Sequence, residues 1–532
     1  MFKYLPFLSG ALVLITLQAG AQSIAGEYAG TITPQDLKKH LTVIAHDSLE
    51  GRATGSPGQK KAADYVASFY RKYGLKPAAT DQSGKPTFFQ AYNLYRGAWE
   101  SAHIRKGRSL YELNEDFYID GLANIPEDEN LSTIFAGYGI ADGSYDSYKG
   151  LDVRNKAVVV FEGEPRNGNG SYLLSGNTEP SKWGRPRAWE EKAKLALEKG
   201  ARTIIIISSK DAQGFEREIQ RRASMAPRVR RLSLRQEETP AQNLAAFTVG
   251  EVTGAALLGL SEKKLKKLKA KTDRNASSPK NNIGTNITVM AKRQSEVVST
   301  ENVAALLEGT DKKDEIVVIS AHLDHIGISA DGQINNGADD DGTGTVALLE
   351  LAEAFSKAKA EGKGPRRSIL FLNVTGEEMG LLGSEFYSEN PLFPSASHVA
   401  NLNIDMIGRV DDAHKNNPEY VYLIGSDKLS SELHAISEEA NKKYVNLTLD
   451  YTFNHPDDPN RFYYRSDHYN FAKKGIPVIF YFTGVHEDYH RPGDDVEKIL
   501  FDRQARIVRL IFHTAWELAN REERIKVDSN KP

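Results

Sequence analysis

Four apolar, strand-like runs in the second half of the chain end in acidic residues or a histidine. The four ends are residues 321–324, 376–378, 403–405 and 488–490, and an acidic triplet at 339–341 follows the first of them. Ionisable groups are costly to bury unless they are paired or bind a metal. Because the carboxyl ends of parallel strands meet at one edge of an open α/β sheet, this pattern predicts a metal site at that edge.

The region after residue 296 alternates between strands and helices. The predicted strands are continuous apolar runs at 315–320, 368–374, 399–404, 420–424 and 477–482, and the predicted helices are amphipathic segments at 345–357, 430–444 and 503–521. Continuous apolar strands are typical of a sheet that is covered on both faces. The sequence therefore predicts an α/β fold with a mostly parallel mixed sheet and helices on both faces.

At 532 residues the chain is too long for one ordinary core. Short β-like runs alternate with Gly- and Asn-rich loops in the middle of the chain, and this character differs from that of the helical segments before it and the α/β region after it. We therefore predict a discontinuous main domain at 22–100 with 290–525, a smaller β-rich inserted domain at 101–289, and a polar tail at 526–532.

The amino-terminal residues predict export. Lys3 supplies a positive charge, residues 8–17 supply a short apolar core, and residues 19–21 form a small-residue cleavage pattern. These features are typical of a secretory signal peptide, which we expect to span residues 1–21. No other long apolar run occurs in the sequence, so we expect no integral membrane segment after cleavage and a periplasmic or secreted protein of a bacterial envelope.

The composition excludes several classes of function. No cysteine is present, so a cysteine nucleophile is excluded and any metal must be held by His, Asp or Glu. The formal net charge of −3 gives no electrostatic reason to expect nucleic acid or an anionic membrane as a partner. Two basic stretches, 221–235 and 263–267, are interpreted as solvated faces, because aliphatic residues interleave with the charges and aromatic residues are absent.

The residue types at the strand ends suit hydrolytic metal chemistry. His322 and Asp324 point to the same face of a strand, where one can bind a metal while the other fixes its orientation. Of the neighbours Glu377 and Glu378, one can bind a metal while the other moves protons. Asp405 is an isolated carboxylate within an apolar run.

Each of these features also has a plain structural interpretation when it is taken alone. A strand-end histidine can be capped by an aspartate in a turn, an acidic run can be solvated at a helix start, and residues 487–495 can form a surface loop. Four such ends on one predicted sheet edge, together with an acidic triplet, favour the metal site over these separate explanations.

At these residues the chain resembles peptidase family M28, the co-catalytic di-zinc aminopeptidases. The resemblance covers residues 296–500 and a front piece that runs from residues 47–52 through residues 74–77. Segments 136–140 and 199–208 resemble the protease-associated (PA) domain that the family often carries as an insert. The resemblance therefore implies a zinc-exopeptidase fold that is interrupted by a PA-like domain.

The resemblance implies two Zn²⁺ per chain with five protein ligands. One zinc would be bound by His322, Asp340 and Asp405, and the other by Asp340, Glu378 and His490. Asp340 is assigned the bridging position because the family's bridging aspartate stands two residues before the first glycine of a stretch that matches 342–344.

The same resemblance implies roles for residues around the ligands. Glu377 would be the general base, Asp324 would orient the histidine ligand, and Tyr489 would donate a hydrogen bond to the oxyanion. Either Arg465 or Tyr464 is expected to line the substrate pocket. His325 is interpreted as a surface residue or as a partner behind the ligands, and His468 as a residue that shapes its loop.

These assignments predict an exported metallo-aminopeptidase that removes the first residue from peptides with a free N-terminus. Each zinc would keep a position open for a shared water or hydroxide, whose proton Glu377 accepts. The alternatives are another activity of the same family (carboxypeptidase, dipeptidase or glutaminyl cyclase) and a non-enzymatic, receptor-like binding protein. A ligand set sufficient for two metals disfavours the single-zinc cyclase, and the presence of Glu377 disfavours the receptor.

Overall fold

The structure is a computed structural model, and it describes residues 24–123, 125–143, 145–168, 170–229, 232–236, 244–275 and 283–530. The predicted signal peptide lies outside these residues. The chain divides into two compact units, unit 1 (Met1–Leu94 with Val298–Pro532) and unit 2 (Tyr95–Val297). No helix in the described part of the chain is both long enough and apolar enough to cross a membrane.

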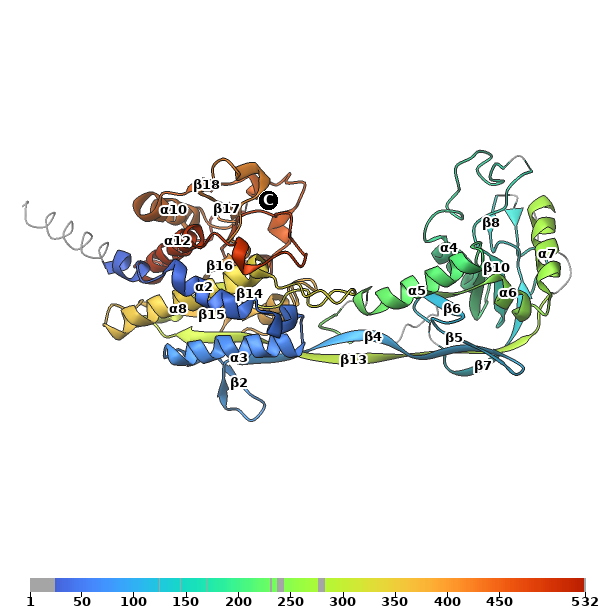
Figure 1. Cartoon of the computed structure of the whole chain (residues 1–532), viewed down its shortest axis with the longest axis horizontal. Coiled ribbons are helices and arrows are strands. Elements are labelled where there is room, and N and C mark those ends of the chain that lie inside the picture. Colours follow the sequence, from blue (N-terminus) through green and yellow to red (C-terminus); the bar gives the residue numbers. More distant parts are fainter. Residues whose placement is uncertain are drawn as a thin grey trace, which may run out of the picture. The chain divides into compact units, whose positions relative to one another are not determined.

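Unit 1 is built on a mixed sheet whose central strands are parallel (Figure 1). In sheet order its strands are β13 (Asn286–Leu307), β15 (Arg367–Val374), β14 (Lys312–His322), β16 (His398–Ile404), β19 (Val478–Phe482), β17 (Tyr420–Ile424) and β18 (Thr448–Asp450). The strands from β15 to β19 in this order are parallel, whereas β13 is antiparallel to β15 and β17 is antiparallel to β19. The predicted mostly parallel mixed sheet is confirmed.

Helices cover both faces of this sheet. One face packs against α2 (Pro34–Ile44), α3 (Pro57–Lys72), α8 (Gly344–Ala360), α10 (Ser431–Ala440) and α12 (Phe501–Asn520), and the other against α9 (Leu382–Glu389) and α11 (His468–Ala472). Neighbouring residues of β14 alternate between the two sides, since Val317 belongs to the first core and Val318 to the second. A strand buried on both faces needs apolar side chains at successive positions, which explains the continuous apolar run in its sequence.

Side-chain caps explain where α2 and α3 begin. The Thr33 hydroxyl accepts the backbone N–H of Asp36 at 3.1 Å, and the Ser56 hydroxyl accepts that of Gln59 at 3.2 Å. Each cap satisfies an N–H group that the first helical turn leaves without a partner, which stabilises the helix by about 1 kcal/mol.

Shorter elements complete unit 1. They are β1 (Lys76–Pro77), β2 (Ala79–Thr80), β3 (Pro86–Thr87) and a tight turn at Asp47–Arg52. The helix predicted at 430–444 is shorter in the structure, because α10 ends at Ala440 and Asn441–Val445 form a separate, wider turn.

Unit 2 contains a second parallel sheet with a core of its own. In this sheet β7 (Ile125–Phe135), β10 (Ala157–Phe161), β11 (Thr203–Ile207) and β12 (Ala245–Val249) are parallel, and β13 and β6 (Phe117–Gly121) flank them in antiparallel orientation. The other strands are β4 (Phe89–Lys106), β5 (Ser109–Glu112), β8 (Ala141–Asp142) and β9 (Tyr145–Asp146). The helices are α4 (Ala188–Glu198), α5 (Ala212–Val229), α6 (Glu251–Leu257) and α7 (Glu262–Asn275).

The four parallel strands of unit 1 end at one edge of the sheet. Their last residues are His322, Val374, Ile404 and Phe482. The loops that leave this edge therefore carry the acidic and histidine residues that the sequence places after each strand, and they bring these residues toward one another.

Candidate metal centre

Three of the predicted ligands meet where β14 and β16 end. His322 is the last residue of β14, Asp405 directly follows β16, and Asp340 comes from the turn Ala338–Thr343 before α8. The Nε2 atom of His322 lies 3.2 Å from Oδ1 of Asp340 and 3.6 Å from Oδ1 of Asp405. All three side chains are buried, so their donor atoms face one another away from solvent.

A second group shares Asp340 with the first. The Nε2 atom of His490 lies 3.2 Å from Oδ2 of Asp340 and 3.1 Å from Oε2 of Glu378. The Glu378 side chain, which follows β15, is 3% exposed, whereas that of His490, in the loop after β19, is 39% exposed. The two carboxylate oxygens of Asp340 therefore face two different histidines. The structure brings together all five residues that were predicted as ligands.

The neighbours of Asp340 in the acidic triplet have other partners. Both oxygens of Asp341 accept backbone N–H groups, from Met406 at 3.1 Å and from His322 at 3.2 Å. Oδ1 of Asp339 likewise accepts a backbone N–H group, at 2.7 Å. A carboxylate oxygen of Asp341 also lies within 4.8 Å of donor atoms of His322 and Asp405. Hydrogen bonds from the backbone already occupy both oxygens of Asp341. Asp340 is therefore the better candidate ligand.

Asp324 differs from its prediction in the atom that it uses. The Nδ1 atom of His322 lies 2.9 Å from the backbone oxygen of Asp324. The residue therefore orients His322 through its carbonyl group, and not through its carboxylate as its side-chain position in the sequence suggested. The turn after β14 directs this carbonyl back toward the ring, while the carboxylate accepts the hydroxyl of Thr54 at 2.7 Å and the backbone N–H of Glu377 at 3.2 Å. A carbonyl can only accept, so Nδ1 carries the proton and Nε2 presents its lone pair to the ligand cluster.

Glu377 and Tyr489 line a small cavity beside the ligands. The cavity has a volume of about 30 Å³ and is also bounded by Asp340 and Asp405. Burial raises the pKa of Glu377 well above that of an exposed glutamate. Burial and the nearby carboxylates also raise the pKa of Tyr489, so its phenol keeps its proton at neutral pH and can donate a hydrogen bond. The Tyr489 ring stacks on His490, with ring centroids 3.9 Å apart.

Part of the lining of this cavity is apolar. This part consists of Met406, Phe462, Phe480, Phe482 and Val485, of which the first four belong to one buried cluster rich in aromatic rings. Of the two residues proposed for the substrate pocket, Arg465 lines the cavity, whereas Tyr464 is 40% exposed and is not among the lining residues.

Of the two interpretations of His325, the structure excludes a surface residue and favours a partner behind the ligands. The side chain is fully buried, and its Nδ1 atom lies 2.7 Å from Oε1 of Glu378 and 3.8 Å from Oδ2 of Asp340. Gly337 packs against the ring so closely that a Cβ at that position would lie 2.5 Å from its Cγ atom. The signal in the sequence was a second histidine three residues after His322, at the same strand end.

Two further buried charges hold the loop that carries the acidic triplet. The Asp494 carboxylate accepts the backbone N–H of Asp340 at 3.1 Å. The Arg52 guanidinium donates to the backbone oxygens of Leu323 and Gly337, both at 2.9 Å. Both residues therefore position the ligand loop without facing the ligand cluster. The signal for Arg52 was its place within the front segment that resembles family M28.

The electrostatics of the cluster favour a bound cation. Burial alone would lower the pKa of His490, but Asp340 and Glu378 outweigh it and raise the pKa to about 10. The buried atoms Nε2 of His322 and Oδ2 of Asp340 make no hydrogen bond of normal geometry with any described residue. Buried polar atoms without partners are costly, and a metal ion would satisfy them. Imidazole nitrogens and carboxylate oxygens are donors that Zn²⁺ binds.

A comparison with protein families agrees with this geometry. Residues 302–515 match the sequence profile of peptidase family M28, and they include all five candidate ligands. The segment that carries the five candidate ligands is therefore similar to peptidase family M28.

Individual relatives match over a similar part of the chain. Aminopeptidase Y of Saccharomyces cerevisiae is 29% identical over 237 residues, which are 42% of this chain and 40% of that protein. A probable zinc metalloprotease of Pyricularia oryzae is 25% identical over 279 residues (44% and 53%), and a probable leucine aminopeptidase of Arthroderma benhamiae is 30% identical over 225 residues (41% and 57%). The chain spans about half the length of the curated relatives it matches.

Among solved structures, the chain is similar to an aminopeptidase from Aneurinibacillus sp. strain AM-1. The match has 17% identity and a TM-score of 0.48, and it covers 96% of this chain and 100% of that one. A zinc aminopeptidase from Bacillus subtilis matches at 17% identity and a TM-score of 0.46, over 94% of this chain and 98% of that one.

Proposed function

We propose that this chain is a metallo-aminopeptidase that binds two Zn²⁺. The observation that carries the proposal is the position of Asp340, whose two carboxylate oxygens face His322 and His490. His322, Asp340 and Asp405 would hold one zinc, and Asp340, Glu378 and His490 would hold the other. The names of the relatives, which include aminopeptidases and a zinc metalloprotease, support this assignment.

The metal ions and the protein have separate tasks in this proposal. Bound zinc would activate a water molecule for attack and polarise the carbonyl of the first peptide bond. Glu377 accepts the proton of the attacking water and then donates it to the leaving amine. Burial raises its pKa, and a raised pKa favours return of the proton to the leaving amine. Asp324 supports this role, because its carboxylate holds the backbone of Glu377 in place.

Tyr489 stabilises the charge that develops on the substrate. Its protonated phenol lines the same cavity as Glu377, and a hydrogen bond from it to the carbonyl oxygen becomes stronger as that oxygen becomes negative. The stacking of its ring on His490 fixes the direction from which it donates.

Two features of the cavity favour an amino-terminal substrate. The carboxylates of Asp405 and Glu377 line it and can bind the free ammonium group of a peptide. The apolar wall formed by Met406, Phe480 and Phe482 suits an uncharged first side chain. The substrate that fits these features is a peptide with a free N-terminus and an apolar first residue.

Two further parts of the proposal concern the rest of the chain. We infer that the protein is exported, on the basis of the signal-like residues 1–21. We also infer that unit 2 is an insert of the PA type, on the basis of segments 136–140 and 199–208.

Hydrolysis of leucine 4-nitroanilide by the full chain tests the activity. We expect turnover that a chelator abolishes and zinc restores. A zinc-loaded protein that does not release nitroaniline would overturn the aminopeptidase assignment. Release of carboxyl-terminal residues from peptides would show a carboxypeptidase, and conversion of amino-terminal glutamine to a ring without hydrolysis would show a cyclase.

Metal analysis tests the shared ligand. Asp340→Asn removes a negative charge between the two histidines, so we expect bound zinc to decrease from two ions per chain to one or none. Asp339→Asn is the matched control, because the Asp339 carboxylate binds a backbone N–H group and lies outside both ligand groups. Two zinc ions in the Asp340→Asn protein would show that Asp340 is not the bridge.

A further inference from the structure

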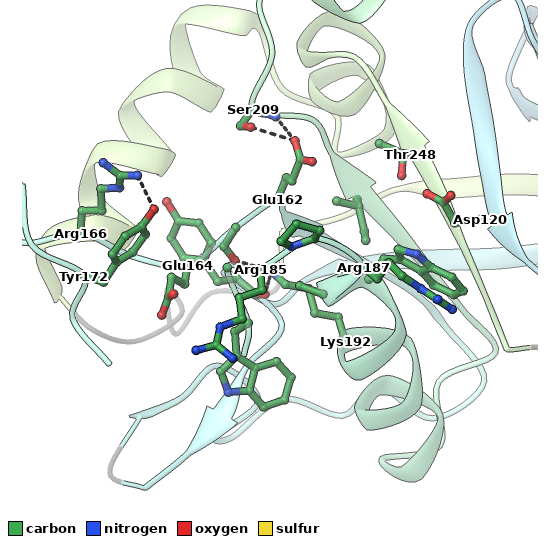
Figure 2. A pocket seen from close by; sticks show the side chains of 18 of the residues that line it. Asp120, Glu162, Glu164, Arg166, Tyr172, Arg185, Arg187, Lys192, Ser209 and Thr248 are labelled. Carbon is green, nitrogen blue, oxygen red and sulfur yellow. Dashed lines mark hydrogen bonds between the residues drawn. The ribbon is translucent and has the colours of Figure 1, made fainter. Parts of the chain in front are cut away.

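Unit 2 contains a cavity of its own at the edge where its parallel strands end (Figure 2). Its volume is about 530 Å³, and small-molecule sites typically have roughly 300–1,000 Å³. Tyr138 follows β7, Glu162 follows β10, Ser209 follows β11, and Thr248 lies near the end of β12. Open α/β sheets bind ligands outside the carboxyl ends of their strands, so the cavity occupies the expected place for a binding site.

Lys192 of α4 fixes the floor of this cavity. Its ammonium group donates to the backbone oxygens of Tyr138 at 2.6 Å, Phe161 at 3.0 Å and Gly163 at 2.6 Å. The side chain is buried, and burial lowers the pKa of Lys192 to about 7. Because the three acceptors lie at the ends of β7 and β10 and just beyond them, Lys192 ties the two strand ends together. The cavity therefore has a defined shape without a ligand.

The carboxylates on the cavity wall already have donors within the protein. Glu162 accepts the backbone N–H of Ser209 at 2.7 Å and its hydroxyl at 2.8 Å. Glu164 accepts the N–H of Ser181 at 2.7 Å and its hydroxyl at 2.8 Å. Of the other two carboxylates, Asp120 pairs with an arginine of α5 at 2.6 Å, and Asp273 accepts the hydroxyl of Tyr138 at 2.5 Å. A metal ion or an amine would have to displace these bonds, so the cavity is poorly suited to a cation.

The charges that remain available at the cavity are positive. The side chains of Arg185 and Lys269 make no hydrogen bond or ion pair with any residue that the structure describes. Arg166 donates to the hydroxyl of Tyr172 at 2.5 Å, with its guanidinium stacked 4.3 Å from the centre of that ring. Guanidinium groups bind carboxylates and phosphates through paired N–H donors. The unused donors therefore favour an anionic ligand.

Aromatic rings supply the rest of the lining. Tyr118, Tyr138, Tyr172, Trp183 and Trp189 all border the cavity, and the first two and Trp183 are buried. Rings that are held in place offer a large contact area to a flat group at little entropic cost. The cavity thus combines ring surfaces with cations, which is the combination that a planar anion requires.

We propose that unit 2 binds a small organic anion that carries a planar ring, at the carboxyl edge of its own parallel sheet. Every residue that lines the cavity lies within Tyr95–Val297, outside the segment that matches peptidase family M28. The binding site does not depend on the proposed peptidase activity.

Calorimetric titration of the full chain with N-acetyl-L-tryptophan tests the proposal. This probe has a ring and a carboxylate, and its blocked amine makes it unsuitable as an aminopeptidase substrate. N-acetyl-L-tryptophanamide has the same ring without the charge, and inorganic phosphate has charge without the ring. We expect the acid to bind roughly ten-fold more tightly than the amide or phosphate, because one charged hydrogen-bonded pair changes affinity by about that factor.

Two substitutions locate the binding. Arg185→Gln removes an unpaired cation at the cavity and should weaken binding of the acid roughly ten-fold while leaving the amide unchanged. Arg108→Gln, at an exposed arginine of unit 2 that does not line the cavity, should change neither. Equal affinity for the acid and the amide would show that the site does not require a negative charge on its ligand. Phosphate binding as tight as that of the acid would show that the site does not require a ring. No binding of the acid, or binding that is insensitive to Arg185→Gln as expected for a carboxylate on the metal centre, would refute the site.

Discussion

Glu377 can be separated from the metal ligands by a single-atom change. Its side chain lines the cavity beside Asp340 and Asp405, and Asp324 holds its backbone N–H at 3.2 Å. Glu377→Gln keeps the size of the side chain but removes its ability to accept a proton. We expect the variant to bind zinc as before and its kcat to fall by roughly two to four orders of magnitude. Metal analysis and nitroanilide turnover measure the two quantities.

A matched substitution controls for general effects of this change. Glu389→Gln, at the exposed end of α9, should leave both zinc content and kcat unchanged. If Glu377→Gln loses zinc, Glu377 is a ligand and the proton must move through another group.

His325 gives a second prediction at the scale of one residue. Its Nδ1 atom lies 2.7 Å from Oε1 of Glu378, while Oε2 of the same carboxylate faces His490. A partner that holds one oxygen of a ligand orients the other, and losing such a partner weakens metal binding roughly 10–100-fold. His325→Ala should therefore weaken one of the two zinc sites by that factor and change kcat little at saturating zinc. Competition with a chelator measures the affinities.

The substitution His325→Gln distinguishes orientation from direct ligation. Glutamine restores a donor but not an imidazole ligand, so it should recover part of the lost zinc affinity if His325 only orients Glu378. A loss of zinc as complete as that of His490→Ala, with no recovery in His325→Gln, would make His325 a ligand itself.

At the scale of elements, α8 buries a carboxyl group against α2, outside the metal centre. Oε1 of Glu350 lies 3.7 Å from Nε2 of His40, and both side chains are buried. Burial raises the pKa of Glu350 from 4.5 to about 8 and lowers that of His40 from 6.5 to about 4. Both groups are therefore uncharged in the folded protein near neutral pH. The unfolded chain releases the glutamate proton at lower pH than the folded chain does.

This difference makes stability depend on pH with a defined sign. Between the unfolded pKa of 4.5 and the folded pKa of about 8, the folded state keeps the Glu350 proton that the unfolded chain has lost, so the contribution of Glu350 to the free energy of unfolding should fall as pH rises. The lowered pKa of His40 contributes in the opposite sense up to about pH 6.5, so the net fall is confined to the interval from about 6.5 to 8. Glu350→Gln removes this decrease in the free energy of unfolding, because glutamine has no proton to release. We expect the variant to gain stability relative to the natural chain across this interval, reaching roughly 2–4 kcal/mol above it. Chemical denaturation on both sides of the interval measures the gain, and parallel pH curves would contradict it.

The elements of unit 1 were largely predictable from the sequence because their signals are local. The runs predicted at 315–320 and 399–404 lie within β14 and β16, since strands buried on both faces require apolar runs that are visible in the sequence. Ligands at the ends of such strands could be named for the same reason. Residue type does not encode the backbone path of a turn, so the use of the Asp324 carbonyl was not predictable. Nor was the approach of Arg52, which reaches the ligand loop from a distant segment.

At the scale of the whole molecule, the metal centre belongs to one of two separate cores. The cluster that contains α2, α3, α8 and α12 lies in unit 1, as do all five candidate ligands, whereas unit 2 has its own cluster around β10 and β12. A ligand that binds only folded protein stabilises the part that it binds, by about 4 kcal/mol when its concentration is 1,000 times the Kd. Zinc should therefore stabilise unit 1 and leave unit 2 unaffected.

Differential scanning calorimetry of the full chain can separate these contributions. We expect two unfolding transitions. A chelator should lower the Tm of one of them, and added zinc should restore that Tm. The variant His322→Ala lacks one ligand, so zinc should raise the Tm of that transition less than in the natural chain. The Tm of the other transition should not change. One transition that shifts as a whole with zinc would show that the two cores unfold together. If zinc changed the Tm of neither transition, the result would contradict the metal centre, because its buried carboxylates and histidines would then be stable without a cation.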